Sequence, residues 1–119
     1  ELVDIYPTLC ELAGIKPPNY IQGQSLTPVL ENPKTILKDE VYTRYKQGEA
    51  VIDKNYSYTE FVIGEKYLGK MLYDMKNDKK QNIDISKLPE NKELVKKYSI
   101  KLEKMRNYVN EDPFQNQSN

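Results

Sequence analysis

The residue types that carry most enzyme chemistry are scarce in this sequence of 119 residues. It contains no histidine and one cysteine, so it lacks an imidazole base and cannot form a disulfide within the chain. The cysteine, Cys10, lies beside an apolar helical pattern, where a thiol is expected to be a small packing group. There is no glycine-rich phosphate loop and no cysteine–histidine metal set. We therefore expect no catalytic residue in this chain.

Three aspartates are the only pattern that suggests a metal. Asp74, Asp78 and Asp84 follow one another at intervals that do not fit the calcium loop of about 12 residues, which also needs a central glycine. Carboxylates in polar connecting segments are usually solvated or hold a turn. We therefore predict no metal site and no cofactor in the chain.

Residues 1–30 predict a short helix, a turn and a second compact segment. Apolar residues recur at helical spacing from Ile5 to Ala13, and Asp4 is placed to cap the helix that they form. Gly14 and the Pro17-Pro18 pair predict its end. The pattern alone is typical of a helix that packs into a core through Ile5, Leu9, Leu12 and Ala13.

Four runs of β-branched and aromatic residues predict strands at 41–45, 50–52, 56–63 and 67–73. Their short connections favour antiparallel neighbours. In the third run, alternation puts Tyr56, Tyr58, Glu60 and Val62 on one face. Gly48 is interpreted as a break between the first two runs, and residues 53–55 as a tight turn.

A long helix is predicted from about Glu90 to Asn110, and a sheet needs such an element to cover its apolar face. We expect an α+β fold, in which a four-stranded antiparallel sheet has a long C-terminal helix packed on one face and a short N-terminal helix before it. The helix should face the sheet through one apolar stripe, formed by Leu94, Tyr98, Leu102, Met105 and Val109.

The charge balance excludes some classes of partner. Lysine and arginine together number 18, as do aspartate and glutamate, so no overall field attracts nucleic acid or an anionic membrane. No apolar run approaches the roughly 18 residues of a membrane span. We expect neither a nucleic-acid partner nor a membrane partner. At 38% hydrophobic residues, the chain suits one small domain that relies on a neighbour.

The order of residues in the first segment resembles a stretch of the sulfatases. That family has D-x-x-P-T-L-x-x-x-A-G followed by Q-G-x-S-L-x-P-x-L, which correspond here to residues 4–14 and 22–30. Residues 42–45, 56–61 and 71–74 are similar to the family's C-terminal subdomain. The resemblance is greatest to bacterial iduronate-2-sulfatase-type enzymes, and phosphonate monoester hydrolases share a similar stretch. The sequence departs from the family pattern at Ile52, Asp53, Lys79, Gln81 and Asp84.

The resemblance implies that residues 1–33 end a sulfatase catalytic domain and its linker, that 34–110 form the C-terminal subdomain, and that 111–119 are a flexible tail. It implies a parent enzyme that hydrolyses sulfate esters of a sugar such as a glycosaminoglycan, with a formylglycine and a calcium ion in the missing N-terminal catalytic domain. The parent would be exported to the periplasm or to the extracellular space in a bacterium, or would be lysosomal. This chain would be inactive alone and would shape the active-site cleft.

Arg44 and Tyr45 are the candidate substrate-binding residues, since the resemblance places this subdomain beside the cleft. A guanidinium can clamp a sugar carboxylate or a sulfate, but it can also form a cross-strand ion pair on the surface. Two other functions stay open: a free-standing carbohydrate- or protein-binding module, and the C-terminal part of a phosphonate monoester hydrolase or phosphodiesterase. We also expect the isolated chain to self-associate through residues 1–30 or to fold them back onto the sheet.

Overall fold

The computed structural model describes residues 1–110 as two compact units, one centred on residues 1–38 and one on residues 39–108. The flexible tail predicted at 111–119 lies outside the described residues. None of the described helices is both long and apolar enough to cross a membrane. The α+β prediction is confirmed, and each unit is described by itself below.

The first unit begins with a 3-10 turn, η1 (Leu2–Asp4), and continues directly into α1 (Ile5–Leu12). Gly14 has φ +66°, and the Ile15 N–H donates to the Cys10 carbonyl at 2.8 Å, so the predicted helix stop is confirmed. The second helix, α2 (Thr27–Glu31), has Pro28 in its first turn, where the missing N–H costs nothing.

Asp4 does not cap α1, and this prediction is wrong. Its carboxylate instead accepts the backbone N–H of Gln24 at 2.8 Å and pairs with the Lys38 ammonium at 2.8 Å. Thr8 makes a parallel link, because its hydroxyl donates to the Asp4 carbonyl and accepts the Leu26 N–H at 2.9 Å. Polar side chains of η1 and α1 therefore bind the segment that follows the helix.

Gly23 lies so close to the 3-10 turn that a side chain would not fit. A Cβ at this position would be 1.9 Å from the carbonyl oxygen of Val3, well inside van der Waals contact. The close approach places the Gln24 N–H within reach of Asp4. The glycine of the Q-G-x-S-L motif thus has a packing role.

The apolar stripe predicted for α1 does not form a core in this chain, and that prediction is wrong. Ile5, Leu9 and Leu12 are 49%, 60% and 61% exposed, whereas Pro7, Thr8 and Cys10 are buried. The physical reason is that the inward side of α1 is fixed by the hydrogen bonds of Thr8 and of Asp4, one turn before it. The apolar side is left without a cover, which is typical of a surface that packs on something else.

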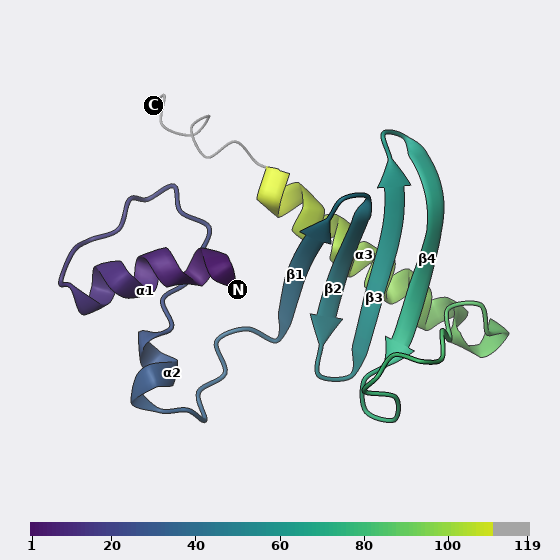
Figure 1. The fold of residues 1–119 in the computed structure, drawn as a ribbon, viewed down its shortest axis with the longest axis horizontal. Helices are drawn as coiled ribbons and strands as arrows, with labels where there is room; N and C mark the ends of the chain where they lie inside the picture. The colour runs from purple at the N-terminus through teal and green to yellow at the C-terminus, as the bar shows by residue number, and fades with distance from the viewer. Residues whose placement is uncertain (111–119) are drawn as a thin grey trace. The chain divides into compact units, whose positions relative to one another are not determined.

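The second unit contains one antiparallel sheet in the order β1-β2-β3-β4 (Figure 1). The strands are β1 (Glu40–Tyr45), β2 (Gly48–Asp53), β3 (Tyr56–Ile63) and β4 (Lys66–Asp74). Gly48 was predicted to break the chain between the first two strands, and this prediction is wrong. It is the first residue of β2 and lies opposite Tyr45. The break comes at the turn before it, where Lys46 has φ +51°.

A long helix, α3 (Lys92–Asn110), crosses one face of this sheet after a 3-10 turn, η2 (Pro89–Asn91) (Figure 1). The core lies between the two, formed by residues of β2, β3, β4 and α3: Val51, Tyr58, Leu72, Val95, Tyr98 and Leu102. Val95 was not in the predicted stripe, and Met105 and Val109 are only half-buried. Spacings of three and four residues place Val95, Tyr98 and Leu102 on one helix face.

Candidate functional site

The predicted substrate-binding residues end β1, directly before the turn that leads to β2. Tyr42 packs against the core beneath α3, so Arg44, two residues later, lies on the same sheet face. Tyr45 lies on the opposite face and is 76% exposed, with the Lys46 ammonium 5.4 Å from its ring centroid. The two side chains therefore leave the strand in opposite directions, and their contact with a substrate stays a prediction.

Arg44 forms the cross-strand ion pair that the sequence left open. Its Nε lies 3.3 Å from a carboxylate oxygen of Glu49, its register partner on β2. The guanidinium remains mostly in water, with its side chain 57% exposed. An exposed pair of this kind stabilises a fold by at most about 1 kcal/mol. Arg44 therefore keeps donors available for a second anion.

Glu49 and Glu60 place two carboxylates on the sheet face that α3 covers, and Arg106 of α3 binds both. Its Nε donates to Glu49, and its Nη2 lies 3.2 Å from Glu60. Glu60 also accepts the hydroxyls of Ser99 at 2.7 Å and Tyr58 at 2.9 Å. Burial, reinforced by Glu60, raises the pKa of Tyr58 above its usual value. This cluster holds α3 on the sheet.

A second polar cluster lies on the same face. Asp53 accepts the Tyr98 hydroxyl at 2.6 Å and lies 3.4 Å from the Lys101 ammonium, which also pairs with Glu40. Burial opposes ionisation of Asp53, but these donors and the N–H groups of its turn outweigh it and lower its pKa. The hydrogen bonds from Asn55 and Tyr56 to Asp53 confirm the tight turn predicted at 53–55.

Arg106 was not predicted to bind the sheet, although the sequence contains a signal for it. Tyr98, Leu102 and Arg106 recur every four residues, so the arginine lies on the buried stripe of α3. On β3, Glu60 likewise follows the inward-facing Tyr58 by two residues. A cation and an anion, each on an inward-facing pattern, predict a pair between the two elements.

The three aspartates considered as metal ligands shape the chain after β4. Asp74 accepts the N–H groups of Lys76 and Asn77, and Asp78 accepts that of Ile83. Asp84 accepts the N–H groups of Leu72 and Ser86. Within residues 1–110, no three histidine, cysteine or acidic side chains come together as metal ligands. The three carboxylates act as hydrogen-bond acceptors for backbone N–H groups.

Comparison with known proteins decides the family. The model of the family "N-sulphoglucosamine sulphohydrolase, C-terminal" matches residues 1–108. The chain belongs to this sulfatase family. The match covers both compact units and includes the first segment, on which the resemblance to sulfatases was based. It confirms that resemblance.

A curated relative and two solved structures extend the comparison. A Δ4,5-hexuronate-2-O-sulfatase of Bacteroides thetaiotaomicron is 34% identical over 96 residues, which cover 73% of this chain and 19% of that protein. A solved structure of a protein in complex with its substrate, D-glucosamine-2-N,6-O-disulfate, matches this chain with a TM-score of 0.79 and 27% identity. The match covers 96% of this chain and 25% of that protein. The phosphonate monoester hydrolase of Agrobacterium radiobacter has a TM-score of 0.71 at 22% identity, over 88% of this chain and 24% of that one, which shows a shared fold. The chain thus spans about a fifth to a quarter of the length of these proteins.

Proposed function

We propose that this sulfatase-family chain is the C-terminal subdomain of a larger sulfatase that hydrolyses a sulfate ester on a saccharide such as a glycosaminoglycan. The family match over residues 1–108 carries the proposal. The hexuronate-2-O-sulfatase relative and the neighbour with a disulfated glucosamine substrate support a sulfated sugar.

In this proposal, catalysis depends on the rest of the parent protein. The sequence has no histidine, and its only cysteine is followed by Glu11-Leu12-Ala13-Gly14, which does not match the C/S-x-P-S-R sequence of a formylglycine precursor. The N-terminal catalytic domain would supply the formylglycine and hold the calcium ion. Export of the parent, or a lysosomal location, belongs to the same proposal.

The chain would contribute a wall of the active-site cleft, with the β1–β2 turn as its contact region. Arg44 offers donors that are mostly in water, and Tyr45 exposes a ring on the other face of the strand. In the parent enzyme, Arg44→Gln should raise KM for a sulfated disaccharide and leave kcat unchanged. Lys54→Gln, which removes an exposed charge beyond the opposite end of β2, is the matched control. An unchanged KM in Arg44→Gln would remove Arg44 from the substrate site.

Activity assays test the function itself. The parent protein should release sulfate from a sulfated disaccharide, and the 119-residue chain alone should release none from an aryl sulfate, with or without calcium. Turnover by the chain alone would contradict the proposal.

The fold shared with the phosphonate monoester hydrolase supports a second candidate, the C-terminal part of a phosphonate monoester hydrolase or phosphodiesterase. A parent that cleaves a phosphonate monoester or a phosphodiester and leaves the sulfated disaccharide intact would favour it. The free-standing binding module differs from both candidates. In that case the chain would bind a saccharide or a protein without being part of a larger enzyme.

A further inference from the structure

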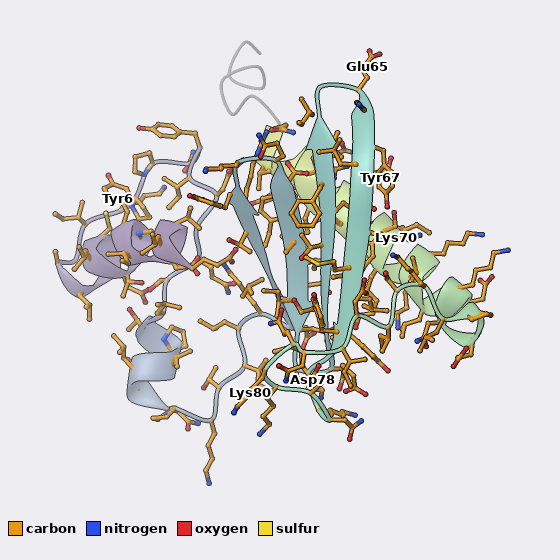
Figure 2. The ribbon with its side chains drawn as sticks, turned by 45° about the vertical axis from the view of Figure 1, so that its right-hand side comes forward. Tyr6, Glu65, Tyr67, Lys70, Asp78 and Lys80 are labelled. Carbon is orange, nitrogen blue, oxygen red and sulfur yellow. The ribbon has the colours of Figure 1, made fainter. Side chains whose placement is uncertain are left out.

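A pocket of about 710 Å³ opens beside β4, the edge strand of the sheet, within the second unit. Its walls are β3 and β4, the segment 86–89 and the first half of α3. Buried Ser86 connects two of these walls, because its hydroxyl contacts the Lys70 carbonyl at 3.4 Å. Figure 2 shows the side chains of Tyr67 and Lys70 leaving β4 on the side where α3 runs. The pocket has the size of sites that hold a drug-sized ligand.

The charge around this pocket is positive. Four lysines line it, against two glutamates: Lys70, Lys87, Lys92 and Lys96, and Glu60 and Glu93. Among the described residues, none of these lysines forms an ion pair, whereas Glu60 is bound by Arg106 and Ser99. Lysines without a partner around a concave surface favour an anion there, and an ammonium pairs with a sulfate as a point charge.

The same pocket presents apolar surface between its charges. Tyr67 of β4 contributes an aromatic ring, Leu88 and Pro89 form the wall before α3, and Val95 and Ile100 come from the helix. A pyranose ring has this combination of features, because its C–H faces are apolar and its sulfate groups extend from its edge. An inorganic anion alone would leave this apolar wall without a contact.

We propose that this pocket is a binding site for a sulfated saccharide. The lysines pair with sulfate groups at the edge of the sugar, and the ring of Tyr67 contacts its C–H face. The inference takes only the class of ligand from the proposed function. It concerns binding by this chain, so it can fail while the parent is a sulfatase, and it can hold if the parent's reaction is a different one.

Calorimetry and amide NMR shifts of the 119-residue chain test the proposal, with D-glucosamine-2-N,6-O-disulfate as the probe. Binding is expected, with shifts centred on Tyr67, Lys70, Ser86 and Lys96, and unsulfated glucosamine should not bind. Replacing Lys70, Lys92 and Lys96 together by Gln should weaken binding about tenfold, from the sum of three ion pairs made by exposed lysines. Tyr67→Ala should also weaken it, and Tyr67→Phe should not.

The matched control replaces Lys54, Lys80 and Lys104 by Gln, which removes the same charge from exposed positions outside the pocket. Its binding should change less than twofold. Equal weakening by both triple variants would show a general attraction to anions and overturn the site. Equal affinity for inorganic sulfate would overturn the saccharide assignment, as would tighter binding of a single-stranded oligonucleotide. Absence of binding at millimolar probe would overturn the proposal entirely. Circular dichroism of each variant monitors its fold.

Discussion

Two arginines pair with Glu49, and they differ in how much water surrounds them. Arg44 contacts it from the neighbouring strand with 57% of its side chain exposed, whereas Arg106 reaches it from α3 with 28% exposed. Water screens the first pair, whereas loss of the second would leave two largely buried carboxylates without their shared cation. The same residue type therefore has different energetic weight at the two positions.

The first prediction compares these arginines. Arg106→Ala should lower the free energy of unfolding by about 2–4 kcal/mol, because Glu60 would remain buried without a counter-ion and Glu49 would keep only the exposed Arg44. Arg44→Ala should lower it by less than about 1 kcal/mol. Urea denaturation of both variants measures the difference. Equal effects would show that the Glu49–Glu60–Arg106 cluster does not hold α3.

The second prediction concerns Asp4, which is 1% exposed. Burial would raise its pKa, but hydrogen bonds from Lys38 and the Gln24 N–H outweigh it and lower the pKa from 3.8 to about 2. A lowered pKa stabilises the fold above the unfolded value of 3.8, and this stabilisation is lost as pH falls toward 2. The loss should be about 2 kcal/mol.

Unfolding measured at pH 5, 3 and 2 would follow that loss, and Asp4→Asn is the control. The variant should start less stable and should lose less between pH 4 and 2, because it has no proton to take up at this position. Asp53 and Asp84, whose pKa values are also lowered, contribute equally to both proteins. Parallel pH profiles would contradict the role given to Asp4.

At the scale of elements, α3 and the sheet depend on each other for burial. Leu102 is fully buried between them, and Ile100, two residues earlier, is 46% exposed. Leu102→Ala should lower the free energy of unfolding by about 2–5 kcal/mol, through lost apolar contact and the cavity that remains. Ile100→Ala should cost about 1 kcal/mol or less. A loss under about 0.5 kcal/mol for Leu102 would show that helix and sheet are not packed as described.

The periodicity of apolar residues predicted the strands and α3 well, because it depends only on the local geometry of a helix or a strand. Alternation placed Tyr56, Tyr58 and Glu60 on one face of β3, and the spacing of α3 identified Tyr98 and Leu102 as buried. The inclusion of Val95 depends on where α3 lies across the sheet, which a helical pattern alone does not specify. The pocket beside β4 was not predicted, because its walls come from segments about 20 residues apart.

At the scale of the whole molecule, the apolar stripe of α1 was misinterpreted as part of a core within this chain. An apolar helical stripe shows that a surface will be covered, but it does not show that the same chain supplies the cover. Leu2, Leu9 and Leu12 are 85%, 60% and 61% exposed. The relatives are four to five times longer than the matched region, and such a protein has additional surfaces to pack on these residues.

The isolated chain is therefore expected to self-associate through α1. At roughly 25 cal/mol per Å², covering about 300 Å² of apolar surface is favourable by about 7 kcal/mol before the cost of association. Sedimentation should show dimers or larger species, and the double variant Leu9→Lys with Leu12→Lys should be monomeric. Ile83→Lys, at a position 65% exposed in the second unit, is the control and should still associate. A monomeric chain at all concentrations would contradict this.

The hydroxyls of Tyr58 and Tyr98 donate to Glu60 and Asp53 beneath α3, and this arrangement has a consequence for alkaline solution. Burial and these carboxylates raise the pKa of both tyrosines above 10, the value of an unfolded tyrosine. The stability that they contribute is complete below pH 10 and is lost as pH rises above it. The sequence has no tryptophan, so the ultraviolet absorbance of tyrosinate is not masked. Tyrosinate absorbance can therefore be used to follow the unfolding of this chain. Part of the signal should appear only together with the loss of helical circular dichroism. Tyr98→Phe should reduce that part. A tyrosinate signal that is complete before any helix is lost would contradict it.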